Sequence, residues 1–218
     1  MFITIKPTTV MAESSFVYEG VEVTWLKHAG FRIKGSRILY IDPYDIPGEL
    51  EKADLILVTH DHFDHMDVKS IRKLSKDDTI VVHPSGCIIE GFESCEVKYG
   101  EEVEIKGVKI KTVPAYNVDK PFHRENCVGY IVEIDGVKIY HAGDTDRIPE
   151  MKNVEADIAL LPVGGTYTMN LQEAVEAAKD IKAKHYIPMH FGAIPQTSAD
   201  PEEFKRKVKG AVILKPLF

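Results

Sequence analysis

The chain has 218 residues, of which 44% are hydrophobic and 28% charged, and its formal net charge is −7. This length is enough to bury one sizeable hydrophobic core. No stretch approaches the 18 uncharged apolar residues of a membrane span, so no span is expected. The negative net charge argues against the broad basic surface of a typical nucleic-acid-binding protein.

The beginning of the chain and the cysteines bear on domain boundaries and compartment. The apolar start is interrupted by Lys6 and Pro7, which is not the pattern of a signal peptide. The three cysteines are odd in number and widely spaced, which does not indicate a disulfide framework. We therefore expect a cytoplasmic protein with an N-terminal extension over residues 1–18 and a single domain over residues 19–218.

The first part of the chain after the extension is predicted to be mainly β-structure. Short β-rich or apolar runs, several of them separated by glycine-containing turns, predict strands over residues 21–26, 31–34, 37–41, 55–59 and 79–83. The run over 55–59 is continuously apolar, which indicates a strand buried on both faces. Apolar residues at helical spacing predict a helix over 67–74, and a short helix is expected over 85–91.

The rest of the chain is β-rich at first and then alternates between strands and helices. Strands are predicted over residues 96–99, 102–105, 108–113, 128–134 and 137–141, with a hairpin turn at Asp135-Gly136. Further strands are expected over 158–162, 185–188 and 212–214, with helices over 171–181 and 201–208. Asp200 is the expected N-cap of the last helix. This order predicts an α/β domain in which two sheets pack together with helices outside.

The motif that indicates chemistry directly follows the apolar run over 55–59. It reads His60-Asp61-His62-Phe63-Asp64-His65, and imidazole and carboxylate groups are ligands that zinc, manganese, iron and nickel accept. Alternate residues at a strand end lie on the same side, so His60 and His62 can converge on one ion. The turn then brings Asp64 and His65 toward a second ion, and two ions about 3.5–4 Å apart form a clamp for ester or phosphoester hydrolysis.

This motif resembles the signature of the metallo-β-lactamase superfamily, which is His-x-His-x-Asp-His after a buried strand. The resemblance covers residues 21–214, nearly the whole chain. It is greatest to small metal-dependent hydrolases related to ascorbate-6-phosphate lactonase and to the phospholipase D that cleaves N-acyl-phosphatidylethanolamines. The segments that suggest this branch are Trp25–Gly30, Tyr40–Tyr44, Tyr140–Thr145 and Ile187–Phe191. The resemblance implies an αββα sandwich of two mixed sheets.

The resemblance also implies the remaining metal ligands. Asp144 matches the carboxylate that bridges the two ions, and His190 matches the last histidine of the second metal. The third histidine of the first site usually follows the strand that ends here near Ala115. In this chain the first histidine after that strand is His123, which we assign as the ligand, with Asn117 or a water as the alternative.

Several further residues are expected to support the chemistry. His28 lies in a motif shared with this branch and is a catalytic candidate that approaches the site or a substrate oxyanion. Asp64 is expected to orient a metal-held hydroxide as well as to bind metal. Asp42 and Asp61 are candidates to accept the free N–H of a liganding imidazole. Structural roles are expected for His83, His141 and His185.

The predicted function is that of a metal-dependent hydrolase. Two divalent ions, zinc most favoured with manganese, nickel or iron as alternatives, would activate a water to cleave a small ester, lactone or phosphodiester. A nuclease of the same superfamily and a non-catalytic metal-binding sensor are the alternatives. The expected substrate is a small anionic molecule, with candidate contacts from the loop 164–169, Tyr116, Lys120 and Arg124. Relatives often assemble, so a homo-oligomer remains open.

Overall fold

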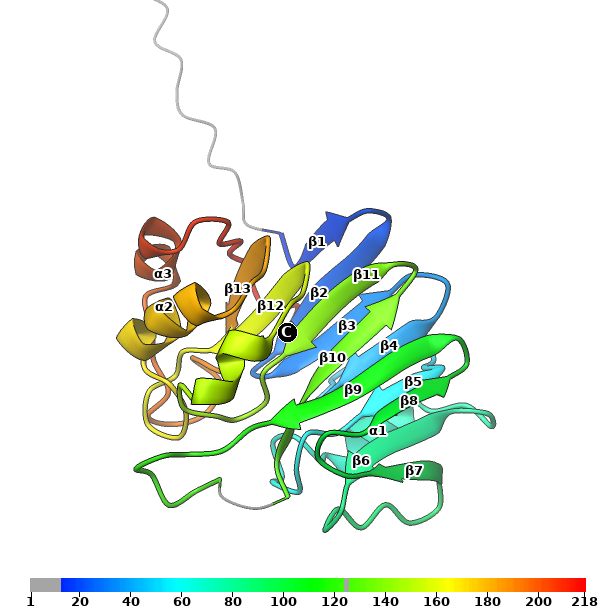
Figure 1. Ribbon diagram of the computed structural model, residues 1–218. Helices are drawn as coiled ribbons and strands as arrows, with labels where there is room; N and C mark the ends of the chain where they lie inside the picture. Colours follow the sequence, from blue (N-terminus) through cyan, green and yellow to red (C-terminus); the bar gives the residue numbers. More distant parts are fainter. Residues whose placement is uncertain (1–12, 124–125) are drawn as a thin grey trace, which may run out of the picture.

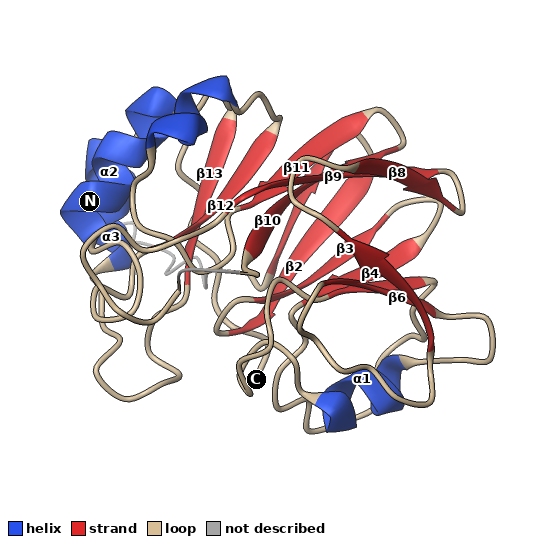
Figure 2. Ribbon diagram, turned by 60° about the horizontal axis from the view of Figure 1, so that its bottom comes forward, coloured by secondary structure: helices blue, strands red, loops and turns tan. Residues whose placement is uncertain are grey.

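Two β-sheets pack face to face in the computed structural model, which describes residues 13–123 and 126–218. Helices cover the outer faces of the two sheets (Figure 1 and Figure 2). The predicted αββα sandwich of two mixed sheets is therefore confirmed. Arg124 lies outside the described residues, as do residues 1–12 of the predicted extension.

In the described part of the chain, the first sheet has seven strands in sequence order. They are β1 (Ser15–Tyr18), β2 (Val21–Lys27), β3 (Gly30–Lys34), β4 (Ile38–Ile41), β5 (Leu55–Leu57), β6 (Ile80–Pro84) and β7 (Glu93–Val97). The strands from β1 to β4 pair antiparallel, and those from β4 to β7 pair parallel. Because β1 pairs with β2, the sheet begins inside the range 1–18 that the sequence set apart as an extension.

The second sheet, as far as the structure describes the chain, has six strands and the same plan. They are β8 (Glu102–Ile105), β9 (Val108–Pro114), β10 (Val128–Ile134), β11 (Val137–His141), β12 (Ile158–Pro162) and β13 (His185–Met189), in the order β13-β12-β11-β10-β9-β8. The strands from β8 to β11 are antiparallel, whereas β11, β12 and β13 are parallel. The turn between β10 and β11 is the predicted Asp135-Gly136 hairpin, with both residues at positive φ.

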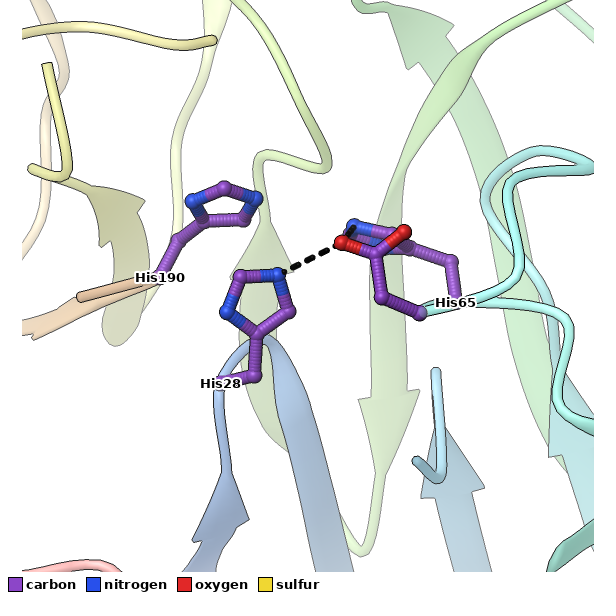
Figure 3. A group of neighbouring side chains, drawn as sticks. His28, His65 and His190 are labelled. Carbon is purple, nitrogen blue, oxygen red and sulfur yellow. Dashed lines mark hydrogen bonds and ion pairs between the residues drawn. The ribbon is translucent and has the colours of Figure 1, made fainter. Parts of the chain in front are cut away.

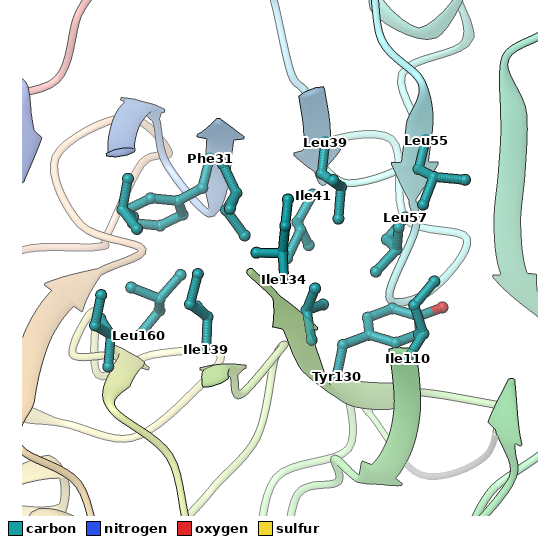
Figure 4. Close-up of a cluster of buried hydrophobic side chains, with 14 of the residues drawn as sticks. Phe31, Leu39, Ile41, Leu55, Leu57, Ile110, Tyr130, Ile134, Ile139 and Leu160 are labelled. Carbon is teal, nitrogen blue, oxygen red and sulfur yellow. The ribbon is translucent and has the colours of Figure 1, made fainter. Parts of the chain in front are cut away.

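The main hydrophobic core lies between the sheets (Figure 4). The first sheet contributes alternate residues of its strands, such as Phe31 and Ile33, and the second contributes Tyr130 and Ile139, all fully buried. This alternation is expected where one face of each strand meets the opposite sheet. The core holds the two sheets in a fixed relative position, and with them the loops at their edges.

Within residues 13–123 and 126–218, three α-helices and one short 3-10 helix complete the fold. They are α1 (Val68–Leu74), α2 (Leu171–Asp180), α3 (Pro201–Lys207) and the 3-10 helix η1 (Pro149–Asn153). Asp67 and Asp200 cap α1 and α3, and Asn170 forms a capping box with Glu173 on α2. The helix α1 packs on the outer face of the first sheet, and α2 and α3 pack on that of the second.

Two predicted elements are absent from the described chain. Residues 85–91 form turns and irregular chain instead of a helix, because Gly86 and Gly91 at its two ends adopt positive φ. Residues 212–214 form no strand. The chain there makes a single parallel bridge, from Tyr186 to Ala211, before it turns away toward β2.

The parallel strands determine where the functional loops lie. The ends of β4 and β5 lead into Asp42 and His60, and the ends of β11 and β13 lead into Asp144 and His190. Carboxyl ends of parallel strands meet at one edge of a sheet, which is where open α/β sheets bind ligands. No helix in the described part of the chain is long and apolar enough to cross a membrane.

Candidate metal centre

Seven histidine and aspartate side chains that the sequence predicted as ligands gather at this edge, together with His28. Their donor atoms form two groups, each with all atoms within 4.8 Å of one another. The first group contains His60, His62 and His123, and the second contains His28, Asp64, His65 and His190. Asp144 forms a third set with His60 and His65, so it lies beside both groups.

The first group is built from three imidazoles that are oriented differently. The Nδ1 atom of His62 lies 3.1 Å from the Nε2 atom of His60 and 3.1 Å from that of His123. The Nδ1 atom of His60 lies 2.9 Å from the Thr59 hydroxyl, and that of His123 lies 3.0 Å from the Asn117 side-chain oxygen. The outer nitrogens of His60 and His123 are thereby fixed, and their Nε2 atoms face the centre of the group.

Asn117 supports His123 and does not enter the group itself. Its side-chain oxygen also accepts a hydrogen bond from the His123 backbone N–H at 2.9 Å, and its backbone N–H donates to the His123 carbonyl. Its amide nitrogen donates to the Tyr167 carbonyl at 3.0 Å. Of the two candidates for the third position, the structure places His123 among the donor atoms and Asn117 behind it.

In the second group, His65 is held by a buried carboxylate. Its Nδ1 atom lies 2.7 Å from an oxygen of Asp42, and its Nε2 atom lies 3.8 Å from Asp64. Asp42 in turn accepts hydrogen bonds from the backbone N–H and the hydroxyl of Thr59, at 2.8 and 2.6 Å. Asp42 thus has the supporting position that the sequence suggested, whereas Asp61 is exposed.

His28 and His190 lie against each other at the seam between the sheets (Figure 3). Their ring centroids are 3.8 Å apart, and the His190 backbone N–H donates to the His28 carbonyl at 3.0 Å. The Nε2 atom of His28 lies 3.0 Å from an oxygen of Asp64. Both histidines are 1% exposed and have φ near +60°, a conformation that costs energy outside glycine and must be held by its surroundings.

Asp144 joins the two groups through its carboxylate. Its Oδ1 atom lies 3.3 Å from the Nε2 atom of His65. Its Oδ2 atom lies 3.3 Å from the Nε2 atom of His123 and 2.9 Å from that of His190. The preceding Gly143 has a φ of +65°, and a Cβ atom there would lie 2.7 Å from a backbone oxygen. The turn that presents Asp144 therefore requires glycine.

The unpaired polar atoms of this cluster test whether it fits a metal ion. The Nε2 atoms of His65 and His190 and the Oδ1 atom of Asp144 are buried and have no hydrogen-bond partner. The His65 nitrogen faces Oδ1 of Asp144 and the His190 nitrogen faces Oδ2 of the same carboxylate, at 3.3 and 2.9 Å. Buried polar atoms are rarely left unpaired, because desolvation without a partner is costly. Nitrogen and oxygen donors that converge in this way fit a divalent cation.

The protonation states of the cluster also suit metal binding. Burial lowers the pKa of His28 and of His123 to about 4, so both are neutral at pH 7, the form in which imidazole binds metal. For Asp64, burial acts to raise the pKa, but the hydrogen bond with His28 and the nearby His65 outweigh it and lower the pKa to about 2. For Asp144, burial is similarly outweighed by the neighbouring histidines, which hold its pKa well below the usual range.

Several other predicted residues lie away from the cluster. His141 has a structural position, with its Nε2 atom 2.8 Å from the Ala29 carbonyl and its Nδ1 atom facing the Gly143 N–H. His185 packs against two aromatic rings of β1, and His83 lies beside the Pro84 carbonyl.

Two of the predicted substrate contacts, Lys120 and Tyr116, are engaged elsewhere. Lys120 forms an ion pair with Asp146 and also donates to the Thr168 carbonyl at 2.9 Å, and Tyr116 donates to Glu150 at 3.1 Å. In the loop 164–169, two backbone N–H groups are taken up by internal hydrogen bonds.

A cavity of about 310 Å³ opens in front of the cluster. Besides ligand candidates, it is lined by Phe63, Phe122, Tyr167 and Ile194. Tyr167 belongs to the loop 164–169 that the sequence suggested for substrate contacts, whereas Phe63, Phe122 and Ile194 were not assigned from the sequence, and neither was the supporting role of Thr59. The one available signal for Thr59 was a hydroxyl residue at the end of an otherwise apolar strand.

The sandwich and its cluster define a class of protein, the metal-binding metallo-β-lactamase fold. Residues 22–190 match the family described as the beta-lactamase superfamily domain. A UPF0173 metal-dependent hydrolase from Pyrococcus furiosus is 40% identical over 90% of this chain and 97% of its own, and one from Archaeoglobus fulgidus is 35% identical over 90% and 96%.

Solved structures agree with this match. The structure of a metal-dependent hydrolase from Parabacteroides distasonis is 31% identical in sequence and has a TM-score of 0.78, and the match covers 93% of this chain and 97% of that chain. A metallo hydrolase from Ignicoccus hospitalis is 26% identical with a TM-score of 0.76, covering 90% and 95%. The chain belongs to the metallo-β-lactamase superfamily and, within it, to the UPF0173 metal-dependent hydrolases.

Proposed function

We propose that the protein uses two divalent metal ions, zinc most favoured, with manganese, nickel or iron as alternatives, to hydrolyse a small ester, lactone or phosphodiester. The observation that carries this proposal is the position of Asp144, whose carboxylate faces His123 of the first ligand group and His65 and His190 of the second. A carboxylate shared by two groups of nitrogen donors is suited to a pair of closely spaced ions.

The ligand sets follow from the geometry. His60, His62 and His123 would hold the first ion, and Asp64, His65 and His190 would hold the second, with Asp144 between them. Ions bound there would activate a water molecule as nucleophile and polarise the scissile bond. The water adds to the acyl carbon or phosphorus, the bond to the leaving oxygen breaks, and one proton of the water passes to that oxygen.

Asp64 and His28 have separate proposed roles in this reaction. Asp64 lines the cavity and is ionised, so it can accept a hydrogen bond from the water and orient it, as well as bind the second ion. His28 is buried and is not among the cavity-lining residues. We therefore assign His28 as a positioning residue that fixes Asp64 by its 3.0 Å contact, in place of the substrate contact expected from the sequence.

Metal content measured together with turnover tests this proposal. Wild type, His123→Ala and His190→Ala are compared by elemental analysis and by hydrolysis of p-nitrophenyl acetate, a simple lactone and bis-p-nitrophenyl phosphate. We expect about two ions per wild-type chain and about one in each variant, with activity reduced on the order of 100-fold or more. His185→Ala, which changes a histidine outside the centre, is the matched control.

The outcomes separate the alternatives. If either variant keeps both ions and its full rate, the proposed ligand set is incorrect. If wild type binds a single ion and still hydrolyses a substrate, the two-ion mechanism fails. If wild type binds two ions and cleaves none of the three bond classes, the non-catalytic sensor becomes the better explanation.

A further inference from the structure

The cavity in front of the metal centre has an apolar rim. Every described lining residue that is not a ligand candidate is aromatic or aliphatic, namely Phe63, Phe122, Tyr167 and Ile194. At about 310 Å³ the cavity is at the lower end of the range for small-molecule sites. Its size and lining suit a small apolar group next to the reacting bond.

Two phenylalanines of the rim belong to the loops that carry the ligands. Phe63 lies between His62 and Asp64 in the chain and is 69% exposed, and Phe122 directly precedes His123 and is 43% exposed. Exposed phenylalanine side chains lose apolar contact with water when something covers them, which is favourable. Since each ring adjoins a ligand in sequence and lines the same cavity, a molecule bound at the metals would cover both rings.

Further aromatic contacts hold these rings in place. Phe122 meets Tyr167 edge to face with ring centroids 4.9 Å apart, and Phe63 meets Tyr44 in the same way at 6.0 Å. Edge-to-face pairs are favourable and directional, so the two rings are supported at the mouth of the cavity. The rim is therefore a built apolar surface and not a pair of isolated exposed side chains.

Positive charge is missing from the described lining of this cavity. No lysine or arginine lines it among residues 13–123 and 126–218. Lys120, which the sequence suggested for an anionic group, is engaged by Asp146 and by a backbone carbonyl. Lys27 lies over the Tyr44 ring and pairs with Asp45. The cavity therefore lacks, in its described part, the cation that would favour an anionic side group.

We infer that the substrate is a carboxylic ester or lactone whose acyl group is uncharged and apolar, and that Phe63 and Phe122 set this preference. The inference rests on the hydrolase function proposed above and narrows its substrate class, away from the anionic molecule expected from the sequence. Water adds to the acyl carbon, the acyl C–O bond breaks, and the products are an apolar carboxylic acid and an alcohol.

A matched series of esters tests the preference with metal-loaded, full-length protein. The substrates are p-nitrophenyl acetate, butyrate and hexanoate, with the monoester of succinate as an anionic analogue of butyrate. We expect kcat/KM to rise on the order of tenfold from acetate to butyrate, because two more methylene groups are buried. The kcat/KM of the succinate monoester should be well below that of the butyrate ester. In the double variant Phe63→Ala/Phe122→Ala, the ratio of kcat/KM for the butyrate ester to kcat/KM for the acetate ester should approach one.

A binding measurement gives a readout that does not depend on turnover. Calorimetric titration measures the affinity of the metal-loaded protein for the product acids acetate, butyrate, hexanoate and succinate. We expect affinity to rise with chain length in wild type and to lose that dependence in the double variant. Tyr99→Ala is the matched control, because Tyr99 is an exposed aromatic residue that does not line this cavity. This variant should keep the wild-type dependence of affinity and of kcat/KM on chain length.

The two measurements distinguish failure of the inference from failure of the proposed function. If none of the esters is cleaved but hexanoate binds more tightly than acetate through Phe63 and Phe122, the apolar site stands and the hydrolytic assignment falls. If rates and affinities do not depend on chain length, or if succinate is preferred, the inference is overturned. It is also overturned if the double variant changes only the sedimenting mass, since the rim would then be an interface between copies of the chain.

Discussion

The two ligand groups of the metal centre are held in different ways. In the first group, the outer nitrogens of His60 and His123 each have a hydrogen-bonding neighbour, Thr59 and Asn117. In the second, His65 is backed by Asp42, but the outer nitrogen of His190 has no partner. His60 and His123 are therefore positioned by neighbouring side chains, whereas His190 is positioned by packing and would gain a partner for its ring only on the side of an ion.

The largest effect is expected where the two groups meet. Asp144→Asn removes the negative charge that faces histidines of both groups, and removing one partner of a buried charge pair costs about 3–5 kcal/mol. We expect both ions to bind on the order of 100-fold more weakly or worse, measured by competition with a chromophoric chelator. Asp157→Asn, which changes an aspartate directly before the start of β12 and outside the ligand cluster, is the control. Unchanged affinity at either group would show that this group does not depend on Asp144.

A smaller and selective effect is expected for His28→Ala. His28 supports both Asp64 and the unpartnered ring of His190, so its loss should weaken the second ion by about 10–100-fold and leave the first nearly unchanged. Stepwise titration of metal-free protein with cobalt, followed by the visible spectrum of each site, separates the two events. His28→Gln restores an N–H donor toward Asp64 and should recover part of the affinity. Equal weakening of both ions would mean that the variant acts through general loss of structure.

The opposite selectivity is expected for Asn117→Ala. This change removes the hydrogen bonds that hold the ring and backbone of His123, so the first ion should be weakened, by about tenfold. The same cobalt titration should show the second ion unaffected. If the first ion binds as in wild type, the first group does not need the support that the comparison assigns to it.

The smallest effect is a pH dependence of the metal-free protein. The pKa of His28 and of His123 is lowered to about 4 by burial, from 6.5. Between these values the unfolded chain binds protons that the folded chain does not, so stability falls as pH decreases from about 6.5 to 4. Urea unfolding in chelator at pH 7.5 and pH 5 measures the difference. His123→Gln should show a shallower decrease, and a slope unchanged from wild type would contradict the assignment to His123.

The same contrast explains which parts of the centre were predictable from sequence. His60, His62, Asp64 and His65 are contiguous, so local strand and turn geometry is enough to place them together. His190 and Asp144 come from the other sheet, and only resemblance to a family suggested them. Pairing between distant strands is not encoded in any short segment.

Other features could not be read from the sequence for the same physical reason. The supporting role of Asn117 depends on a hydrogen bond to a residue on a loop whose path is not regular. The apolar rim depends on Phe63 and Tyr167 meeting across one cavity from opposite sheets. By contrast, elements with clear periodicity, such as α2, were predicted well, because apolar residues recur at regular spacing along one face of the element.

The position of the centre on the seam has a consequence for the whole molecule. Ligands before the middle of the chain, on the first sheet, face His190 near its end, on the second sheet. An ion held by both acts as a crosslink that closes a loop of more than half the polypeptide, in the way that a long-range disulfide does. Metal supply should therefore set the resistance of the folded chain to heat and proteases, because an ion that binds only the native state stabilises it by mass action.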